Sequence, residues 1–451
     1  MARRYVCNRR GLAVERGLVV EMLINRLMCL RILILLSGCV LFAADRPQAE
    51  LELRAQADFD RVVWSIPTQI PDVDHCIQSQ VAAISVSSPA GLASLYFREG
   101  FCRLAQATIT RQPASFQEAA AALKKSVDWW PEAVGRLPKN YDVPTVPSGA
   151  RVLAAIARLQ TQPDAATVDQ AKLEIAAGIE NPACISTIVP ANLCQAILSV
   201  GREWLGWAAL QHDDLFEASR HFSDRPDRGW WLWTAGLTAS GKGNEPEARG
   251  RFRQALDAWT RAQNEQVSMV ARLAPKPDMP RVLLRLGSSE ILTGAPAAAV
   301  ATLDAAVKAD PNLVRAIFLR ARAEELSGKS EQALADYSLA SRTAFANAND
   351  LASGEAHLYR GIQFYRRKDY SHAEDEFSSA LNFAIPPDLV HDAEAWRHMA
   401  ALAGGACGES RVLLEDLLTR CSPYFPKPEA RALASACPLS VAAAPTGSPT
   451  R

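Results

Sequence analysis

The sequence has no excess of charge of either sign, because 49 Lys and Arg residues balance 49 Asp and Glu residues. A protein that coats nucleic acid carries a marked basic excess, so we expect no nucleic-acid partner. The balance is an average over unlike parts. Residues 1–44 hold seven Arg, no Lys and only two Glu, which leaves the rest of the chain mildly acidic. The basic excess therefore lies at the front of the chain.

The apolar run behind these arginines is too short to span a membrane. Residues 32–44 contain no charge over 13 positions, whereas a transmembrane helix needs about 20 apolar residues. A short run after basic residues is typical of a signal peptide. Within it, Leu36-Ser37-Gly38-Cys39 resembles the lipobox of bacterial lipoproteins, which implies lipidation of Cys39. Cleavage without a lipid and an uncleaved anchor remain the alternatives. We expect a protein exported to the periplasm or cell envelope, with 1–44 as its targeting segment.

The sequence also lacks any Cys-x-x-Cys pair, so a zinc ribbon or a thioredoxin-type site has no support. Seven cysteines remain after the signal, and an oxidising compartment favours disulfides between them. Cys184 with Cys194, and Cys76 with Cys102, are the expected pairs. Among Cys407, Cys421 and Cys437, one must stay free or pair elsewhere. Buried, reduced cysteines are the alternative interpretation.

Alternating strand patterns are scarce, and a phased repeat takes their place. In 280–311, Gly287 lies in a first apolar helix, Gly294 interrupts it, and Ala299 and Leu303 mark a second helix. Four further copies keep the same spacing. In each, a small residue precedes an Ala by 12 positions, and a large apolar residue follows the Ala by four; the copies are Gly206/Ala218/Phe222, Gly236/Ala248/Phe252, Ala321/Ala333/Tyr337 and Gly361/Ala373/Phe377.

This spacing resembles the tetratricopeptide repeat (TPR), whose pattern is W-x2-L-G-x2-Y, then A-x3-F, then P. The small residue lets two antiparallel helices approach, and the large residue fills the gap between them. The resemblance implies an all-α fold, a right-handed superhelix of antiparallel helix pairs. We divide the chain into an N-terminal helical region with a degenerate repeat (45–147), TPR-like repeats (148–387, clearest at 199–260 and 280–387), C-terminal capping helices (388–437) and a disordered tail (438–451).

Two groups of residues imitate chemical motifs. Gly236–Gly243 matches G-x4-G-K, but Gly243 stands where a P-loop needs Ser or Thr, and the repeat already explains both glycines. His391, Glu394 and His398 share one helical face, which we interpret as solvated because a third rigid metal ligand is missing. We therefore expect no cofactor, metal or small-molecule substrate, and no enzymatic activity.

The resemblance implies that the first helix of each pair lines a concave groove. Its register places a set of aromatic and arginine side chains toward that groove: Trp207, Trp230, Trp233, Arg281, Arg315, Phe318, Arg322 and Tyr365. Aromatic rings anchor interfaces, and arginine binds carboxylates in a bidentate manner. Trp204 and Trp231 should pack inward. Core packing of the tryptophans, and a solvated face without a ligand, are the alternatives.

The sequence therefore predicts a non-enzymatic, exported scaffold that binds protein or extended peptide partners. One alternative is an envelope enzyme with a helical-repeat arm, similar to the lytic transglycosylases. That would require a compact catalytic region, and no repeat-free segment of suitable size is evident. The other alternative is a lipid-anchored component of outer-membrane assembly, with membrane attachment through Cys39 or an uncleaved signal.

Overall fold

The computed structural model describes residues 46–63, 72–135, 147–161, 163–180, 190–223, 228–264 and 268–437. The targeting segment with Cys39, the tail 438–451, and Cys184 lie outside these residues. Within them the chain is helical and forms no strand. No described helix is both long and apolar enough to cross a membrane.

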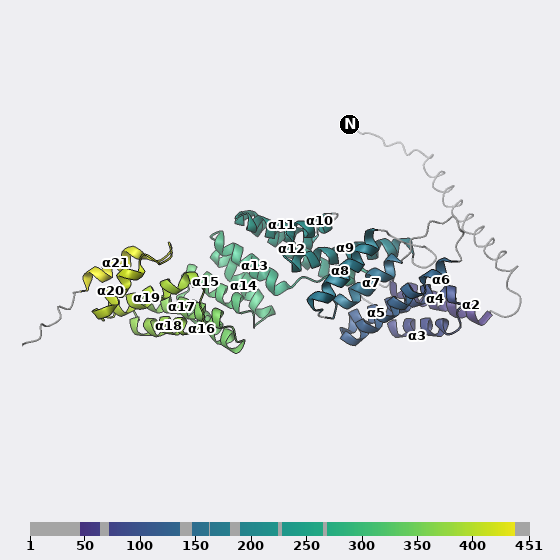
Figure 1. Cartoon of the computed structure of the whole chain (residues 1–451), viewed down its shortest axis with the longest axis horizontal. Coiled ribbons are helices and arrows are strands. Elements are labelled where there is room, and N and C mark those ends of the chain that lie inside the picture. Colours follow the sequence, from purple (N-terminus) through teal and green to yellow (C-terminus); the bar gives the residue numbers. More distant parts are fainter. Residues whose placement is uncertain are drawn as a thin grey trace, which may run out of the picture. The chain divides into compact units, whose positions relative to one another are not determined.

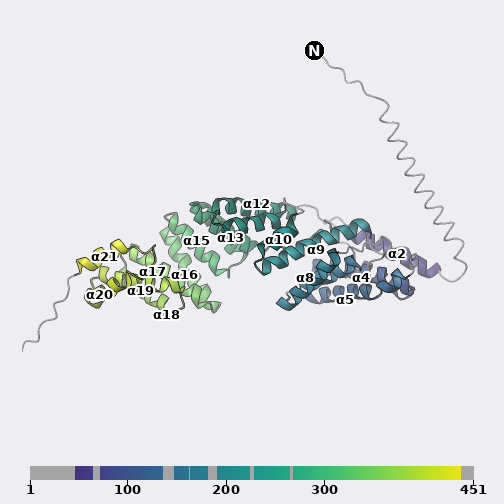
Figure 2. The same ribbon diagram turned by 45° about the horizontal axis from the view of Figure 1, so that its top comes forward.

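The chain forms two compact units, divided within one helix. Unit 1 comprises residues up to Leu205 together with 266–274, and unit 2 comprises Gly206–Glu265 and Pro275 onward. Figure 1 colours the chain in order, and Figure 2 shows the same helices turned by 45°.

Unit 1 is built from helices that pack mainly on their sequence neighbours. They are α2 (Arg46–Val63), α3 (Val73–Ile84), α4 (Pro89–Thr110), α5 (Pro113–Asp128), α6 (Trp130–Val134), α7 (Ser148–Leu159), α8 (Ala165–Glu180) and the first part of α9 (Ala191–Gln211). A short 3-10 helix, η1 (Ala271–Leu273), also belongs to this unit. The indole nitrogen of Trp204 donates to the carbonyl of Leu273 at 2.8 Å and holds that segment.

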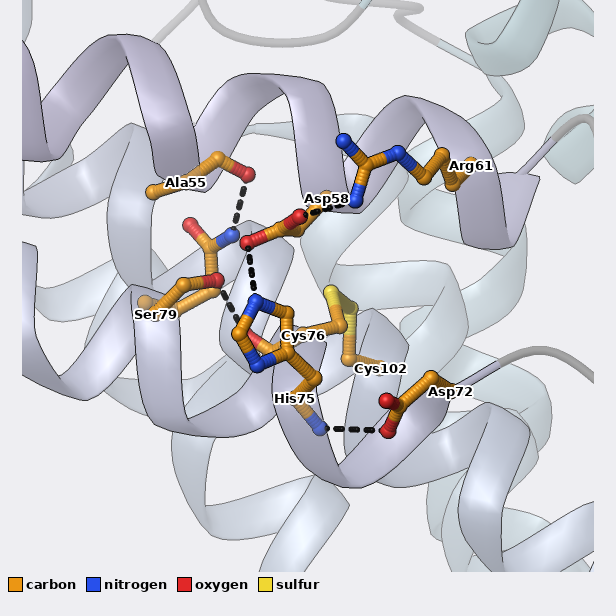
Figure 3. Close-up of a disulfide and its surroundings, with 9 residues drawn as sticks. Ala55, Asp58, Arg61, Asp72, His75, Cys76, Ser79 and Cys102 are labelled. Atoms are coloured by element: carbon orange, nitrogen blue, oxygen red, sulfur yellow. Dashed lines mark hydrogen bonds and ion pairs between the residues drawn. A yellow bond between two sulfur atoms is a disulfide. The ribbon is translucent and has the colours of Figure 1, made fainter.

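A disulfide between Cys76 and Cys102 joins α3 to α4 in unit 1, with the two Cα atoms 6.2 Å apart. This disulfide is one of the two pairs predicted from the sequence. Figure 3 shows that His75 points toward Asp58 of α2 beside this link, with Nε2 3.3 Å from the carboxylate. Asp72 caps α3 by accepting the backbone N–H of His75 at 2.9 Å. Both sulfur-bearing residues are fully buried, so the link belongs to the core.

Unit 2 contains the repeats. After the end of α9 its helices are α10 (Leu215–Phe222), α11 (Gly229–Gly241), α12 (Glu245–Asn264), α13 (Met279–Leu292), α14 (Pro296–Ala309), α15 (Val314–Leu326), α16 (Ser330–Ala346), α17 (Asp350–Arg366), α18 (Tyr370–Asn382), the 3-10 turn η2 (Pro387–Leu389), α19 (Val390–Ala403), α20 (Gly408–Leu417) and α21 (Lys427–Ala436). From α11 onward the two helices of each repeat pack on one another, and from α10 onward each second helix packs on the next first helix.

The small residue of each first helix faces the large residue 16 positions later, as the repeat predicts. A Cβ added to Gly287 would lie 2.5 Å from Cγ of Leu303, and one added to Gly236 would lie 2.5 Å from Cε1 of Phe252. The alanines of the second helices are buried completely at all five repeat positions. The repeat pattern therefore corresponds to the packing that closes each helix pair.

The turn inside each pair has a fixed geometry. The residue seven positions after the small residue has a positive φ in all five copies: Asp213, Gly243, Gly294, Gly328 and Lys368. The next residue donates its N–H to a carbonyl five positions back, for example Ala295 to Glu290 at 2.8 Å. This is the Schellman end of a helix, for which a left-handed residue is needed. The segment Gly241–Gly243, which resembles part of a P-loop in sequence, therefore forms the turn after α11.

Candidate functional site

The tryptophan cluster of unit 2 is mostly core. Trp230 is 9% exposed, its ring stacks on Phe222 at 5.9 Å, and its indole nitrogen donates to the carbonyl of Pro275 at 3.1 Å. The prediction that Trp230 faces an open groove is therefore wrong. Because α11 is apolar around its whole circumference, it packs on more than one side.

Trp207 and Trp233 lie at the margin of this cluster and are half-buried. The ring of Trp233 lies 5.0 Å from that of Phe252 and 6.2 Å from that of Trp259. Trp204 is buried, as the sequence predicts, whereas Trp231 is half-buried with the guanidinium of Arg251 above its ring. A role for Trp207 and Trp233 in partner binding stays a prediction.

The first helices α15 and α17 bring arginines and aromatic rings together. The guanidinium of Arg315 lies 5.0 Å from the ring centroid of Phe318, and that of Arg322 lies 4.6 Å from the ring of Tyr359. The two rings meet edge to face at 5.2 Å. We call this surface, completed by Arg366, the first-helix face. The register predicts that Arg315, Phe318 and Arg322 face the groove, but Phe318 is only 5% exposed, so its ring belongs to the core and the prediction is wrong for it. The register missed Tyr359.

Acidic side chains lie beneath these arginines. Glu355 pairs with Arg315 at 2.8 Å, and Glu325 pairs with both Arg322 and Arg366. Glu325 also accepts the hydroxyl of Tyr337 at 2.8 Å. Burial opposes ionisation of Glu325, but the neighbouring arginines and the Tyr337 hydroxyl hold its pKa below the usual value.

On the first-helix face, the arginine side chains are more exposed than the carboxylates that they pair with. The side chains of Arg315 and Arg366 are 53% and 57% exposed, whereas those of Glu355 and Glu325 are 18% and 7% exposed. The guanidinium groups thus form the outer layer, and the carboxylates orient them from below. Such a surface can contact carboxylates and aromatic groups with arginines that are already positioned.

Two other predicted groove residues lie differently. Arg281 is 77% exposed and pairs with Asp278 in the first turn of α13, at 3.1 Å. Tyr365 is buried, and its hydroxyl donates to Glu429 of α21 at 3.1 Å. Burial and the Glu429 carboxylate raise the pKa of Tyr365 above its usual value. Tyr365 is therefore covered by the chain itself.

The structure corrects the interpretation of the histidine face on α19. His398 is buried, and its Nδ1 lies 3.3 Å from the hydroxyl of Ser410. His391 pairs with Glu394 at 3.4 Å. The face is packed at His398 because α20 covers it. Among the described residues, no group of three His, Cys, Asp or Glu side chains is placed to hold a metal ion.

Three polar side chains, which no sequence motif indicates, link α16, α17 and α18. Nε2 of His357 lies 2.9 Å from the hydroxyl of Ser341, and Nδ1 lies 2.8 Å from a carboxylate oxygen of Glu376. The order serine, histidine, acid matches that of acyl-transfer sites. However, Ser341 is buried inside a helix whose backbone N–H groups are used by the helix itself, so nothing there could stabilise an oxyanion. The hydrogen-bonded row of Ser341, His357 and Glu376 therefore packs adjacent repeats together.

Two adjacent repeats each bury a glutamate in the first helix, and the two glutamates differ in their partners. Glu290 and Glu324 occupy equivalent positions, where the TPR pattern has an aromatic residue. Glu290 accepts the hydroxyl of Thr302 at 2.8 Å and pairs with Arg253. One carboxylate oxygen of Glu324 is buried without a hydrogen-bond partner. Burial and the negative charge of Asp336 raise the pKa of Glu324 to about 7.

No protein-family model and no curated protein sequence matches the chain. Its structure is similar to solved helical-repeat proteins. Yeast Tom70 is 11% identical, with 86% of this chain and 88% of that chain covered and a TM-score of 0.36. PilW, a type IV pilus biogenesis factor, is 16% identical, with 52% and 98% covered and a TM-score of 0.36. YrrB, described as a TPR protein with an unusual peptide-binding site, is 15% identical, with 41% and 85% covered and a TM-score of 0.33.

These likenesses are distant, so the assignment depends on the chain's own geometry. Five helix pairs keep one spacing of small residue, left-handed turn and large partner. The pairs follow one another through contacts between neighbours, as in a solenoid. In its fold, the chain is a helical-repeat protein of the tetratricopeptide kind.

Proposed function

We propose that the chain is an exported scaffold that binds protein or extended peptide partners on the first-helix face of unit 2 and performs no chemistry itself. The observation that carries the proposal is the layering of that face. The exposed guanidinium groups of Arg315 and Arg366 pair with the less exposed carboxylates of Glu355 and Glu325, and the guanidinium of Arg315 lies over the ring of Phe318, which meets that of Tyr359. A partner segment with carboxylates and aromatic side chains complements it.

The cysteines support export. Cys76–Cys102 in unit 1 and Cys407–Cys437 in unit 2 are disulfides, and such links persist in oxidising compartments. The proposed location is the periplasm or cell envelope, with Cys39 as the lipid attachment point. Metabolic labelling with a fatty-acid analogue tests the anchor: label on the natural sequence and none on Cys39→Ala supports it, and label on neither excludes it.

Crosslinking followed by purification from the envelope tests the binding face. The natural sequence is compared with Arg315→Ala/Arg366→Ala and with Arg342→Ala, a control on the exposed side of the second helix α16. We expect the double variant to lose partners that the control keeps. If circular dichroism shows both variants folded and the double variant keeps its partners, the face is wrong.

A further inference from the structure

The segment after α20 turns back along the first helix α19. Asp392, in the first turn of α19, accepts the backbone N–H of Ser422 at 2.8 Å and its hydroxyl at 2.6 Å. Further on, the ring of Phe425 meets that of Trp396 edge to face at 5.4 Å. The segment thus begins at the start of α19 and follows the helix toward its end.

α21 then reaches past its neighbours. From α13 onward, each first helix contacts the next one, as α15 does α17 and α17 does α19. α21 contacts α19 in the same way, but Glu429 also accepts the hydroxyl of Tyr365 on α17 at 3.1 Å. α21 therefore contacts both α19 and α17, the first helix that precedes α19. This part of α21 lies across the surface that α17 and α19 form together. Tyr365 in turn packs against Trp396 at 5.1 Å.

A covalent link holds the far end of this segment. Cys437 forms a disulfide with Cys407, which directly precedes α20. Nη1 of Arg411 also donates to the carbonyl of Cys437 at 2.7 Å. Between the two anchored ends, Phe425 contacts Trp396 and Glu429 contacts Tyr365, and Ala430 and Ala434 are buried in the same core. Glu429 itself lies on the exposed side of α21.

We propose that the segment from Ser422 through α21 is an internal ligand of unit 2, which covers Tyr365 of α17 and Trp396 of α19, where these first helices continue the first-helix face, until a partner segment displaces it. The partner chemistry follows from what the segment presents: the aromatic ring of Phe425 just before α21 and, four residues later, the carboxylate of Glu429 in α21. The inference deepens the proposed function, since it names the class of segment that the face takes. The main chain from α20 tethers the internal ligand, and the disulfide closes this tether into a loop, so the effective concentration is high, on the order of millimolar for a short tether.

Binding of the chain's own segment in trans tests this. The probe is a fluorescent peptide of residues 422–436, and the receptor is the full chain carrying Cys407→Ser, Cys437→Ser, Phe425→Ala and Glu429→Ala. We expect the variant to bind the probe at least roughly tenfold more tightly than the natural chain does. A probe with the Phe425 and Glu429 positions changed to Ala should not bind. Equal affinity of both receptors, or of both probes, overturns the proposal.

Hydrogen exchange on the natural chain gives a second test that does not depend on the variant's folding. Reduction by a dithiol converts the Cys407–Cys437 link into two thiols and oxidises the dithiol. We expect faster exchange in 427–436 after reduction, with α17 and α19 still protected apart from the residues around Tyr365. Unchanged exchange in 427–436 contradicts the proposal. Because neither test uses an envelope partner, failure here is distinguishable from failure of the partner purification.

Discussion

Gly361 of α17 lies directly against the ring of Phe377 of α18: a Cβ at position 361 would be 2.6 Å from Cε1 of that ring. The ring is fully buried, so it has no free space into which it could move. The same relationship closes the other repeats, except that Ala321 takes the small position opposite Tyr337. The approach of the two helices therefore depends on the size of one side chain.

Gly361→Val should lower the free energy of unfolding of unit 2 by about 1–3 kcal/mol, because the added methyl groups overlap Phe377. Gly361→Ala should cost less, since helix propensity favours Ala over Gly by about 1 kcal/mol. Gly250→Ala is the matched control, because Gly250 lies in α12 with nothing within 4 Å of an added Cβ. Urea unfolding measures the difference. Equal losses for Gly361→Val and Gly250→Ala would refute the packing argument.

Stability should also depend on the proton of Glu324. The folded pKa of about 7 lies above the ordinary value of 4.5, so the native state favours the protonated form. This contribution is fully present below pH 4.5 and is lost as pH rises through 7. Glu324→Gln should therefore be more stable than the natural chain at pH 8, by about 1–3 kcal/mol, and should differ little at pH 4.5.

Glu290→Gln is the control for that effect, because its carboxylate is paired with Arg253 and Thr302. Removing the charge there should destabilise the chain at pH 8. Denaturation at the two pH values separates the cases, and a Glu324→Gln variant that is less stable than the natural chain at pH 8 would contradict the assignment.

The disulfide of unit 1 should contribute to stability. Cys76→Ser/Cys102→Ser should lower the free energy of unfolding by about 2–4 kcal/mol, because the link closes a loop between residues 26 apart. Cys421→Ser is the control, since Cys421 is a buried free thiol whose loss breaks no link. Thermal unfolding without reductant compares the three proteins. A smaller effect in the double variant than in the control would be inconsistent with the role assigned to the link.

Trp204→Phe should loosen the segment that returns to unit 1. The variant keeps a ring but leaves the Leu273 carbonyl without its donor, at a cost of about 1–3 kcal/mol. Hydrogen exchange in 268–274 should accelerate more than in Trp231→Phe, where the indole is half-buried in unit 2. Equal exchange in the two variants would argue against this anchor.

The repeat was predictable because its determinants are local and repeated. Gly287, Ala299 and Leu303 lie within one helix pair, and the same spacing recurs four more times. Side-chain exposure was harder to infer. The repeat register predicts that Trp230 faces outward. It is buried instead, because α11 is apolar on all sides and the indole nitrogen donates to the carbonyl of Pro275.

The contacts that shape the candidate site are distant in sequence. Arg366 and Glu325 lie 41 residues apart, and Tyr365 meets Glu429 across 64 residues. No local spacing indicates such pairs. The sequence pattern did not distinguish α21 from the other C-terminal capping helices of 388–437 for a related reason. Its short sequence has few large apolar residues, and it is held by contacts with α17, α19 and Cys407.

The path of the chain through the two units limits how the protein can be divided. The chain leaves unit 1 after Leu205, builds α10, α11 and α12 in unit 2, and contributes η1 to unit 1 before the remaining repeats. A single cut near residue 205 would deprive unit 1 of the carbonyl that Trp204 binds, and a cut after 274 would remove the end of α9 to α12 from unit 2. A fragment of either unit therefore needs two chain breaks or a graft of the 266–274 segment. Proteolysis within 206–265 would leave unit 1 complete only while the two pieces stay together.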